Sequence, residues 1–366
     1  MPLASRAAFL EQLSGLFYPK TDSPLSDAQL RALGRREPPP ESFPLPLLHE
    51  LARQWRGETA RSIVPLAEQG TFHRLFRLSW GDETAILRVQ LPQTPDEPPD
   101  PRLPLEEQLT RRLRQAGIPA APILHTDISR RHAPWDWQML APAAGRPLTE
   151  LEGDESTLLQ LLERLGAMMA RLHRALPVTG AGWPDPWSWS DAPADAPREA
   201  RPLRGLFPQW TDYLTRCLDD HLRRLTDDQL LTPEEARTIA SHFATFASSP
   251  VAPGLLHGDP GSHNAFHQAG EISALLDWDD ALIGDPWYDV AFWATFHPER
   301  RYGAFLRGYL GGRAWSPEEA RRFRLYHLRI TLAKIVHRQR FSYADLPGRP
   351  TGRQRILESA QRVFST

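Results

Sequence analysis

The spacing of apolar residues is strand-like in one part of the chain. Residues 62–91 carry short apolar runs that break at Gly70 and again at the stretch WGDE, which predicts three strands joined by turns. Residues 105–117 instead repeat leucine at helical spacing and end on glycine, which predicts one helix. Two more strands are predicted in residues 119–127 and 135–142, so this part of the chain is expected to form a small α+β lobe with one helix.

The remainder of the chain is mostly helical in pattern. Residues 156–176 place leucine and methionine along one stripe of a strongly amphipathic helix. Residues 232–246 and 316–337 each begin with Ser or Thr, then Pro, then acidic residues, which is typical of a helix start. The stretch over residues 180–202, between the first two of these helices, is rich in Trp and Pro and predicts a long ordered loop that shapes a pocket.

The first sixty residues predict a helical extension. Residues 25–34 have a capping-box start and a glycine stop, residues 36–46 form a stiff Pro-rich linker, and a short helix is expected over 47–55. Strands with one helix, followed by helices, predict an α+β fold with two lobes. The expected divisions are an extension over 1–60, a small lobe over 61–142 and a helical lobe over 143–366.

Composition narrows the setting of the protein. The net charge of −2 over 366 residues gives no global attraction to nucleic acid or to an acidic membrane. Cys217 is the single cysteine, which excludes an internal disulfide. The N-terminus has apolar residues at helical spacing, interrupted by polar residues, and lacks the pattern of a signal peptide. We expect a cytoplasmic protein, a monomer or homodimer, without nucleic-acid or membrane partners.

The most informative stretch is LLHGDPGSHNAF, residues 255–266. Two apolar segments after it flank HQAGE, which predicts a β-hairpin with Gly270 in its turn. Antiparallel pairing would bring Asn264 close to Asp277, so that an amide oxygen and a carboxylate could hold Mg²⁺. Asp259 lies on the loop entering the hairpin, where it could act as a base toward a hydroxyl group. This arrangement is typical of phosphoryl transfer.

The combination of HGDPGSHN with LLDWDDALIGDPWYDVA resembles the aminoglycoside phosphotransferase and choline kinase family, which has a protein-kinase-like fold. GTFHRLFRLSWGDETAILRV resembles the nucleotide-covering loop and the strand after it, and WQMLAPAAGRPL resembles the hinge. The resemblance extends over about residues 63–336 and is loosely closest to hygromycin-type kinases. It implies two lobes, an antiparallel sheet in the smaller and mostly helices in the larger.

The resemblance also assigns roles to individual residues. On the nucleotide side it implies a glycine that lets backbone approach the phosphates, a cation–acid pair and a backbone contact to adenine, at Gly70, Arg88, Glu106, Leu140, Ala141 and Pro142. On the acceptor side it implies a catalytic base, two metal ligands and two braces of the loop, at Asp259, Asn264, Asp277, His257 and Asp289. Many kinases have Lys where this chain has Arg88, and an arginine could fork onto phosphate or onto Glu106.

The leading interpretation is a kinase that uses Mg²⁺ and ATP, or another nucleoside triphosphate, to phosphorylate a small-molecule hydroxyl. The acceptor could be an aminoglycoside or another antibiotic, which would imply antibiotic resistance, or a metabolite such as a choline-like alcohol. The alternative is a nucleotide-binding pseudokinase or regulatory module without phosphotransfer. A zinc hydrolase built on His257, His263 and His267 ranks third, and the Arg-rich tail over 338–362 is expected to be a solvated helix face.

Overall fold

A computed structural model describes residues 3–23, 43–66, 73–90, 98–151, 153–189, 201–246, 252–340 and 348–364. The chain forms two compact units. Unit 1 comprises Met1–Pro24, Leu148–Asn264 and Asp280–Thr366, and unit 2 comprises Leu25–Pro147 and Ala265–Asp279. The predicted helix over 25–34, most of the Pro-rich linker and the predicted nucleotide-covering glycine, Gly70, lie outside the described residues.

Unit 2 is built on a five-stranded sheet in the order β1-β2-β3-β5-β4. The sequence predicted all five strands. They are β1 (Ser62–Pro65), β2 (His73–Trp80), β3 (Glu83–Gln90), β4 (Ile123–Asp127) and β5 (Trp137–Leu140). Neighbouring strands are antiparallel, and Arg88 on β3 lies directly opposite Gln138 on β5 in the register. This register places two polar side chains side by side in the middle of the sheet.

Two helices of unit 2 pack their apolar stripes against the sheet. Helix α4 (Leu45–Arg56) buries Leu48, Leu51 and Ala52, and helix α5 (Arg102–Gln115) buries its predicted leucine face. Residues of α4, β2, β3 and β5 share one hydrophobic core. Helix α5 also buries Glu106, and a charged side chain in such a place needs a partner.

The predicted hairpin is present and belongs to unit 2. Strands β11 (Ala265–Gln268) and β12 (Glu271–Leu275) pair from Ala265↔Leu275 to Gln268↔Glu271, with Gly270 at a φ of 79° in the turn. Strand β6 (Arg146–Pro147) pairs with β11 and completes a three-stranded sheet. Backbone hydrogen bonds of Leu275 with Pro119 and Ala121 also join the hairpin to the rest of unit 2.

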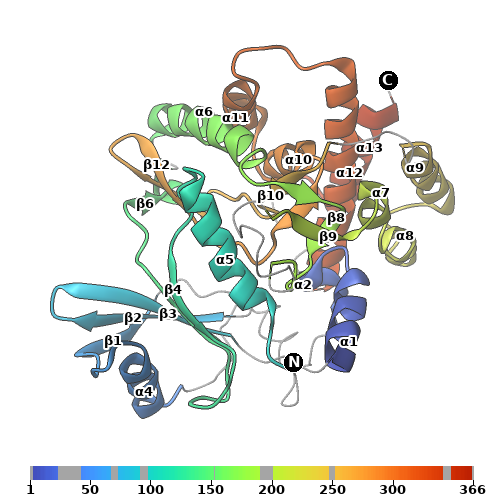
Figure 1. Cartoon of the computed structure of the whole chain (residues 1–366). Helices are drawn as coiled ribbons and strands as arrows, with labels where there is room; N and C mark the ends of the chain where they lie inside the picture. The colour runs from blue at the N-terminus through green and yellow to red at the C-terminus, as the bar shows by residue number, and fades with distance from the viewer. Residues whose placement is uncertain are drawn as a thin grey trace. The chain divides into compact units, whose positions relative to one another are not determined.

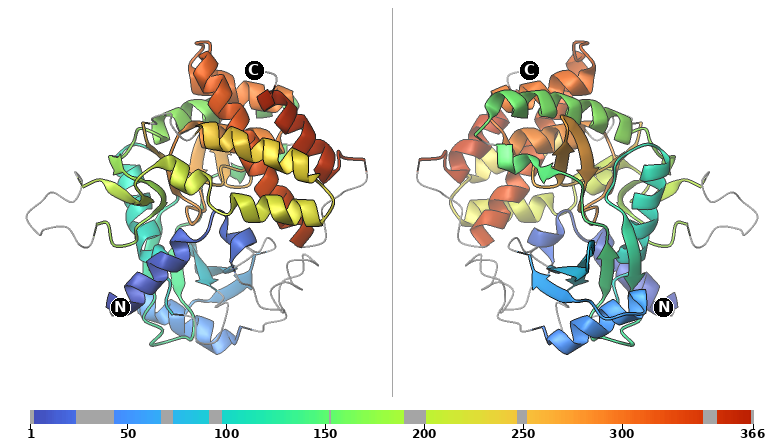
Figure 2. Two further views of the ribbon diagram at one scale, coloured as in Figure 1. Left: turned by 90° about the vertical axis from the view of Figure 1, so that its right-hand side faces the viewer. Right: turned by 90° about the vertical axis from the view of Figure 1, so that its left-hand side faces the viewer.

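Unit 1 is mostly helical, as the sequence predicted. Its elements include η1 (Leu148–Leu151), α6 (Glu155–Leu172), α7 (Trp210–Leu214), α8 (Leu218–Asp227), α9 (Pro233–Phe246), α10 (Trp287–Phe296), α11 (Glu299–Leu310), α12 (Pro317–Arg340) and α13 (Gly352–Phe364). Helices α6 and α11 lie side by side (Figure 1). Helices α8, α9, α12 and α13 gather on one side of unit 1 (Figure 2).

A second five-stranded sheet, in the order β10-β13-β8-β9-β7, lies within unit 1. Its strands are β7 (Val178–Thr179), β8 (Ala181–Pro184), β9 (Leu203–Phe207), β10 (Gly254–Leu256) and β13 (Leu282–Gly284). Strand β8 corrects part of the prediction of a long loop over residues 180–202. All four of its residues are buried, and pairing with β9 and β13 overrides the turn preference of its Gly and Pro.

The N-terminal segment is not a separate extension in the part that the structure describes. Helices α1 (Leu3–Ser14) and α2 (Pro19–Asp22) belong to unit 1, whereas α4 belongs to unit 2. Phe17 is 1% exposed, and its backbone oxygen accepts a hydrogen bond of 2.7 Å from the Tyr213 hydroxyl. The guanidinium of Arg329 stacks 3.5 Å from the centre of the Phe17 ring. Residues 3–23 therefore form an integral part of the helical unit.

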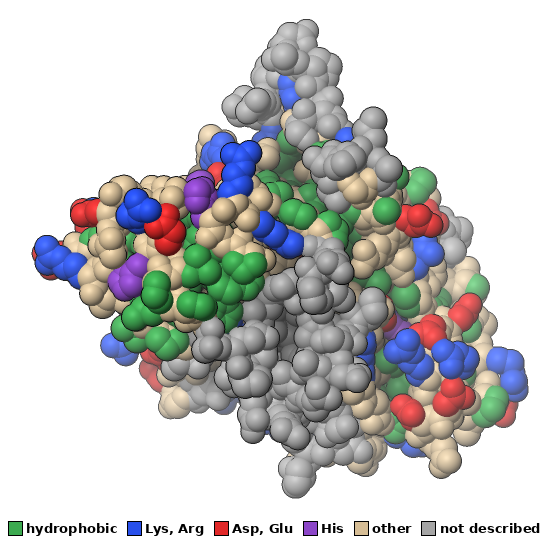
Figure 3. Space-filling view, turned by 90° about the horizontal axis from the view of Figure 1, so that it is seen from below, with side chains coloured by type: hydrophobic (Ala, Val, Ile, Leu, Met, Phe, Trp, Pro, Cys, Tyr) green, Lys and Arg blue, Asp and Glu red, His purple; other side chains and the backbone are tan. Residues whose placement is uncertain are grey.

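On the face drawn in Figure 3, acidic and basic side chains lie interspersed, in keeping with the net charge of −2. Within the residues that the structure describes, we find no helix with the length and apolar character needed to cross a membrane.

Candidate active site

The loop predicted to be catalytic follows strand β10 and is held by one buried carboxylate. Asp289, in the first turn of α10, accepts hydrogen bonds from the backbone N–H of His257 at 2.7 Å and of Gly258 at 3.1 Å. Asp289 is fully buried, so both charge-assisted bonds lie in a low-dielectric environment. The carboxylate thus fixes the backbone immediately before Asp259.

A histidine that the sequence reasoning missed anchors this carboxylate. The Nε2 atom of His173, at the end of α6, lies 3.1 Å from Asp289 Oδ2, and its Nδ1 atom lies 2.9 Å from the Tyr309 hydroxyl. A carboxylate only accepts, so Nε2 donates to it and the Tyr309 O–H donates to Nδ1. Burial raises the pKa of the Tyr309 phenol, which keeps that donor protonated. His173 therefore orients Asp289, as Asp289 orients the loop.

The loop itself forms a tight turn around Asp259. The Asp259 carbonyl oxygen accepts from Gly261 N at 2.8 Å and from the Asn264 side-chain Nδ2 at 3.0 Å. Gly258 adopts a φ of 82°, and a Cβ atom there would lie only 1.8 Å from the backbone oxygen of Asp280. The Asp259 carboxylate retains 15% of its exposure, and Nε2 of His263 lies 4.0 Å from it. The turn thus holds Asp259 at the protein surface while its backbone is fixed.

Asp285 reinforces the start of the same helix. Its carboxylate accepts from Trp287 N at 3.0 Å, and also from the Tyr326 hydroxyl at 2.7 Å and Arg322 Nη1 at 3.2 Å. Burial raises the pKa of the Asp285 carboxyl, against the lowering effect of the Trp287 and Tyr326 hydrogen bonds. These contacts link α12 to the first turn of α10, which carries Asp289.

In unit 2, the predicted pair of Arg88 and Glu106 is present and buried. Their side chains are 6% and 5% exposed, and the guanidinium bonds directly to the Glu106 carboxylate. A third residue, Gln138, joins them: its Oε1 accepts from Arg88 Nε at 2.8 Å. Burial by itself would lower the pKa of the Arg88 guanidinium, but the charges of Glu106, Asp277 and Asp279 leave that pKa raised. The cation is therefore stabilised in its charged form.

Asp277 follows the hairpin of unit 2 and faces this cation. Its Oδ1 atom lies 3.7 Å from Arg88 Nη1, and its backbone adopts a φ of 66°, a left-handed conformation that is uncommon outside glycine. The next backbone N–H, of Trp278, donates to the Glu106 carboxylate at 3.3 Å. Such strained positions persist where surrounding contacts hold them, and they occur often at functional sites.

One backbone hydrogen bond limits which groups of the predicted hinge, residues 140–142, could contact adenine. The backbone N–H of Ala141 donates to Pro122 O at 3.0 Å, and Pro142 has no N–H to offer. Leu140 lies in register with both β3 and β4. A contact between residues 140–142 and a purine base stays a prediction. The backbone carbonyl groups of these residues are the atoms suited to make it.

The chemistry of the predicted metal ligands suits Mg²⁺. Because Asn264 donates through Nδ2 to its own loop, its Oδ1 is the atom that faces away from that bond. The Asn264 Oδ1 atom in unit 1 and the Asp277 carboxylate in unit 2 are each hard oxygen donors, the kind that Mg²⁺ prefers. Within the described ranges, no group of three His, Cys, Asp or Glu side chains is arranged to hold a metal ion. The sequence-based zinc alternative therefore gains no support from the described histidines.

Residues 62–325 match the model of the phosphotransferase enzyme family. The chain belongs to that family. Hygromycin-B 4-O-kinase of Escherichia coli is 29% identical over 140 residues, which are 36% of this chain and 39% of that kinase. The chain thus matches well under half the length of that curated family relative.

Solved structures of the phosphotransferase family confirm the fold. Aminoglycoside phosphotransferase APH(4)-Ia, crystallised as a thermostable mutant with ADP and hygromycin B, matches with a TM-score of 0.64 at 20% identity, over 87% of this chain and 99% of that chain. A choline/ethanolamine kinase family protein from Mesorhizobium loti matches with a TM-score of 0.50 at 16% identity, over 83% and 87%. The predicted α+β, protein-kinase-like fold and family are confirmed.

Proposed function

We propose that this phosphotransferase-family protein is a kinase that transfers the γ-phosphoryl group of ATP to a hydroxyl group of a small molecule. One observation carries the proposal: Asp289 fixes the backbone of His257 and Gly258, so that the Asp259 carboxylate is presented from a rigid loop. Phosphoryl transfer depends mainly on positioning and charge neutralisation, which is what a fixed carboxylate and a buried cation provide.

Asp259 is the proposed base. As the acceptor oxygen bonds to the γ-phosphorus and the bond to the β-phosphate oxygen breaks, the hydroxyl proton passes to the Asp259 carboxylate. Asn264 and Asp277 are the proposed ligands of Mg²⁺, which when bound would neutralise charge on the phosphates. Arg88, with its pKa raised by neighbouring carboxylates, supplies a permanent cation for the nucleotide phosphates. His257 braces the loop through its backbone.

The proposed acceptors are sugar-like, aminoglycoside-like or amino-alcohol compounds. The similarity to hygromycin-B 4-O-kinase over 140 residues supports an aminoglycoside, and the likeness to the choline/ethanolamine kinase family supports an amino-alcohol. An aminoglycoside acceptor would make the protein an antibiotic-resistance enzyme. The cytoplasmic location and the monomeric or homodimeric state remain predictions.

The test is ATP turnover by the purified chain with Mg²⁺ against a panel of hygromycin B, other aminoglycosides, sugars and choline-like alcohols. Replacing Asp259 by Asn should reduce kcat about 100-fold or more, because loss of a general base costs about 10²–10⁴. The matched control is Asp228→Asn, since Asp228 is an exposed carboxylate of the same unit. Nucleotide binding without turnover on every acceptor would instead support the pseudokinase alternative.

A further inference from the structure

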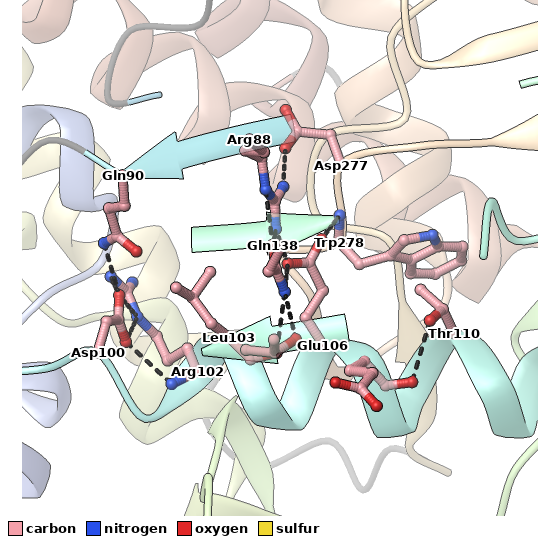
Figure 4. A network of polar contacts seen from close by, with 12 residues as sticks. Arg88, Gln90, Asp100, Arg102, Leu103, Glu106, Thr110, Gln138, Asp277 and Trp278 are labelled. Atoms are coloured by element: carbon pink, nitrogen blue, oxygen red, sulfur yellow. Dashed lines mark hydrogen bonds and ion pairs between the residues drawn. The ribbon is translucent and has the colours of Figure 1, made fainter. Parts of the chain in front are cut away.

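The guanidinium of Arg88 has more hydrogen-bond donors than its ion pair uses. An arginine carries five N–H donors in a planar fork, whereas a lysine carries three on one rotating nitrogen. At 5% exposure, Arg88 must find its acceptors inside the protein. Figure 4 shows three side chains around it: Glu106 from α5, Gln138 from β5 and Asp277 after the hairpin.

We propose that Gln138 is a positioning residue that sets the orientation of the Arg88 fork and makes arginine, rather than lysine, the working cation at this position. The proposal rests on the proposed kinase function, because it concerns how the phosphate-binding cation is aimed.

The N–H groups of the Arg88 guanidinium are directed to different partners. Gln138 Oε1 accepts from Arg88 Nε at 2.8 Å and also from Nη2, which is shared with Glu106. With Nε and Nη2 engaged on one side, the planar guanidinium turns Nη1 the other way. Nη1 lies 3.7 Å from Oδ1 of Asp277, which is itself a proposed metal ligand. Gln138 thus decides which edge of the fork faces the proposed nucleotide side.

The second step is that Gln138 is itself held. Its side-chain Nε2 donates to Leu103 O at 3.1 Å and to Thr126 Oγ1 at 3.3 Å, and Gln138 is 0% exposed. A flipped amide would place its NH₂ group against the guanidinium and its oxygen against the Leu103 carbonyl. The amide therefore has one orientation that satisfies its surroundings, and that orientation presents Oε1 to Arg88.

The third step concerns lysine. An ammonium group that reached Glu106 would have no Nε at the position facing Gln138. From the position of Nη2 an ammonium could still donate to Gln138 Oε1, but it has no second donor held in the same plane, so Gln138 could not set its orientation. In this chain Gln138 can therefore orient an arginine through two fixed donors, Nε and Nη2, whereas it could not orient a lysine in that way.

The test is a double-mutant cycle of Arg88→Lys with Gln138→Met, which keeps the side-chain length but removes the amide. The readout is kcat/KM for ATP, with the thermal transition of each variant. We expect Gln138→Met to lower kcat/KM about 10- to 100-fold with arginine present, and by less than about threefold in the Arg88→Lys background. Gln90→Met is the matched control, because Gln90 is a glutamine of β3 that bonds to Asp100.

Equal losses from Gln138→Met in the two backgrounds would overturn the proposal, since a purely structural role does not depend on which cation is present. Should Gln138→Met not fold, Thr126→Val takes its place in the cycle, because it removes one anchor of the amide and leaves Arg88 intact. A drop of about threefold with arginine, absent in the Arg88→Lys background, is the supporting result for that variant, and equal drops overturn the proposal.

Failure of the kinase function can be distinguished from failure of this proposal. If the unaltered chain shows no turnover, the affinity for Mg²⁺ and AMP-PNP is measured through the same cycle, and the same pattern of losses is required. Absence of both turnover and AMP-PNP binding overturns the proposed function and the role of Gln138 together. If the unaltered chain turns over ATP but Gln138→Met lowers kcat/KM equally in the Arg88 and Arg88→Lys backgrounds, only the role of Gln138 is overturned.

Discussion

Replacing Asp289 by Ala should both destabilise unit 1 and release the loop that carries Asp259. The change removes the acceptor for three buried donors: the backbone N–H groups of His257 and Gly258 and the Nε2–H of His173. Each unsatisfied buried donor costs about 1–3 kcal/mol, and breaking one buried charged partnership typically costs about 3–5 kcal/mol in total. We therefore expect a loss of about 3–5 kcal/mol in the free energy of unfolding.

Thermal unfolding of the purified chain measures this loss. In a unit of this size, about 2 °C of midpoint is lost for each kcal/mol, so the transition should fall by about 6 °C or more. The control is Asp154→Ala, since Asp154 is an exposed helix cap whose carboxylate accepts from Thr157 N at 3.1 Å, a contact worth about 1 kcal/mol. A loss for Asp289→Ala no larger than that of the control would refute the reasoning. So would a folded Asp289→Ala chain with unchanged kcat, because the loop would then hold its geometry without the carboxylate.

Two further predictions concern glycine geometry and pH. Gly258→Ala should strongly reduce stability and activity, because its Cβ would lie 1.8 Å from Asp280 O. Gly270→Ala has no neighbour within 4 Å and should cost about 1–2 kcal/mol for its left-handed φ. Chemical unfolding of the two variants measures both losses, and equal losses would contradict a clash at Gly258. Burial, with nearby arginines, lowers the pKa of His297 and of His327 from 6.5 to about 4. On acidification these histidines bind protons in the unfolded chain at a higher pH than in the folded chain. The free energy of unfolding should therefore fall between pH 6.5 and 4. If a His327→Gln variant shows an equally large fall, His327 does not contribute to the pH dependence.

The elements with strong local patterns were predictable from the sequence. The leucine stripe of α6 and the turn at Gly270 report their structures because helical spacing and a left-handed turn residue act over a few neighbouring positions. Strand β8 was missed for the opposite reason. Its Gly and Pro favour a loop locally, and only pairing with β9 and β13 makes it a strand.

The candidate site divides in the same way. His257, Asp259 and Asn264 could be proposed as site residues because a short loop carries them in one recognisable stretch, and Arg88 and Glu106 were proposed through the family resemblance. Asp289 was likewise predicted as a brace of the loop, whereas His173 and Gln138, which contact Asp289 and Arg88, were not predicted.

By itself, the sequence determined most helices and strands, the loop that carries Asp259 and the family resemblance. Each of these depends on residues that are close together in the chain. Only the tertiary structure decided that Gln138 orients Arg88, 50 residues away, and that His173 orients Asp289, 116 residues away. A buried polar side chain must find a partner, but nothing in its own neighbourhood states which one. That choice is made when the strands and helices pack.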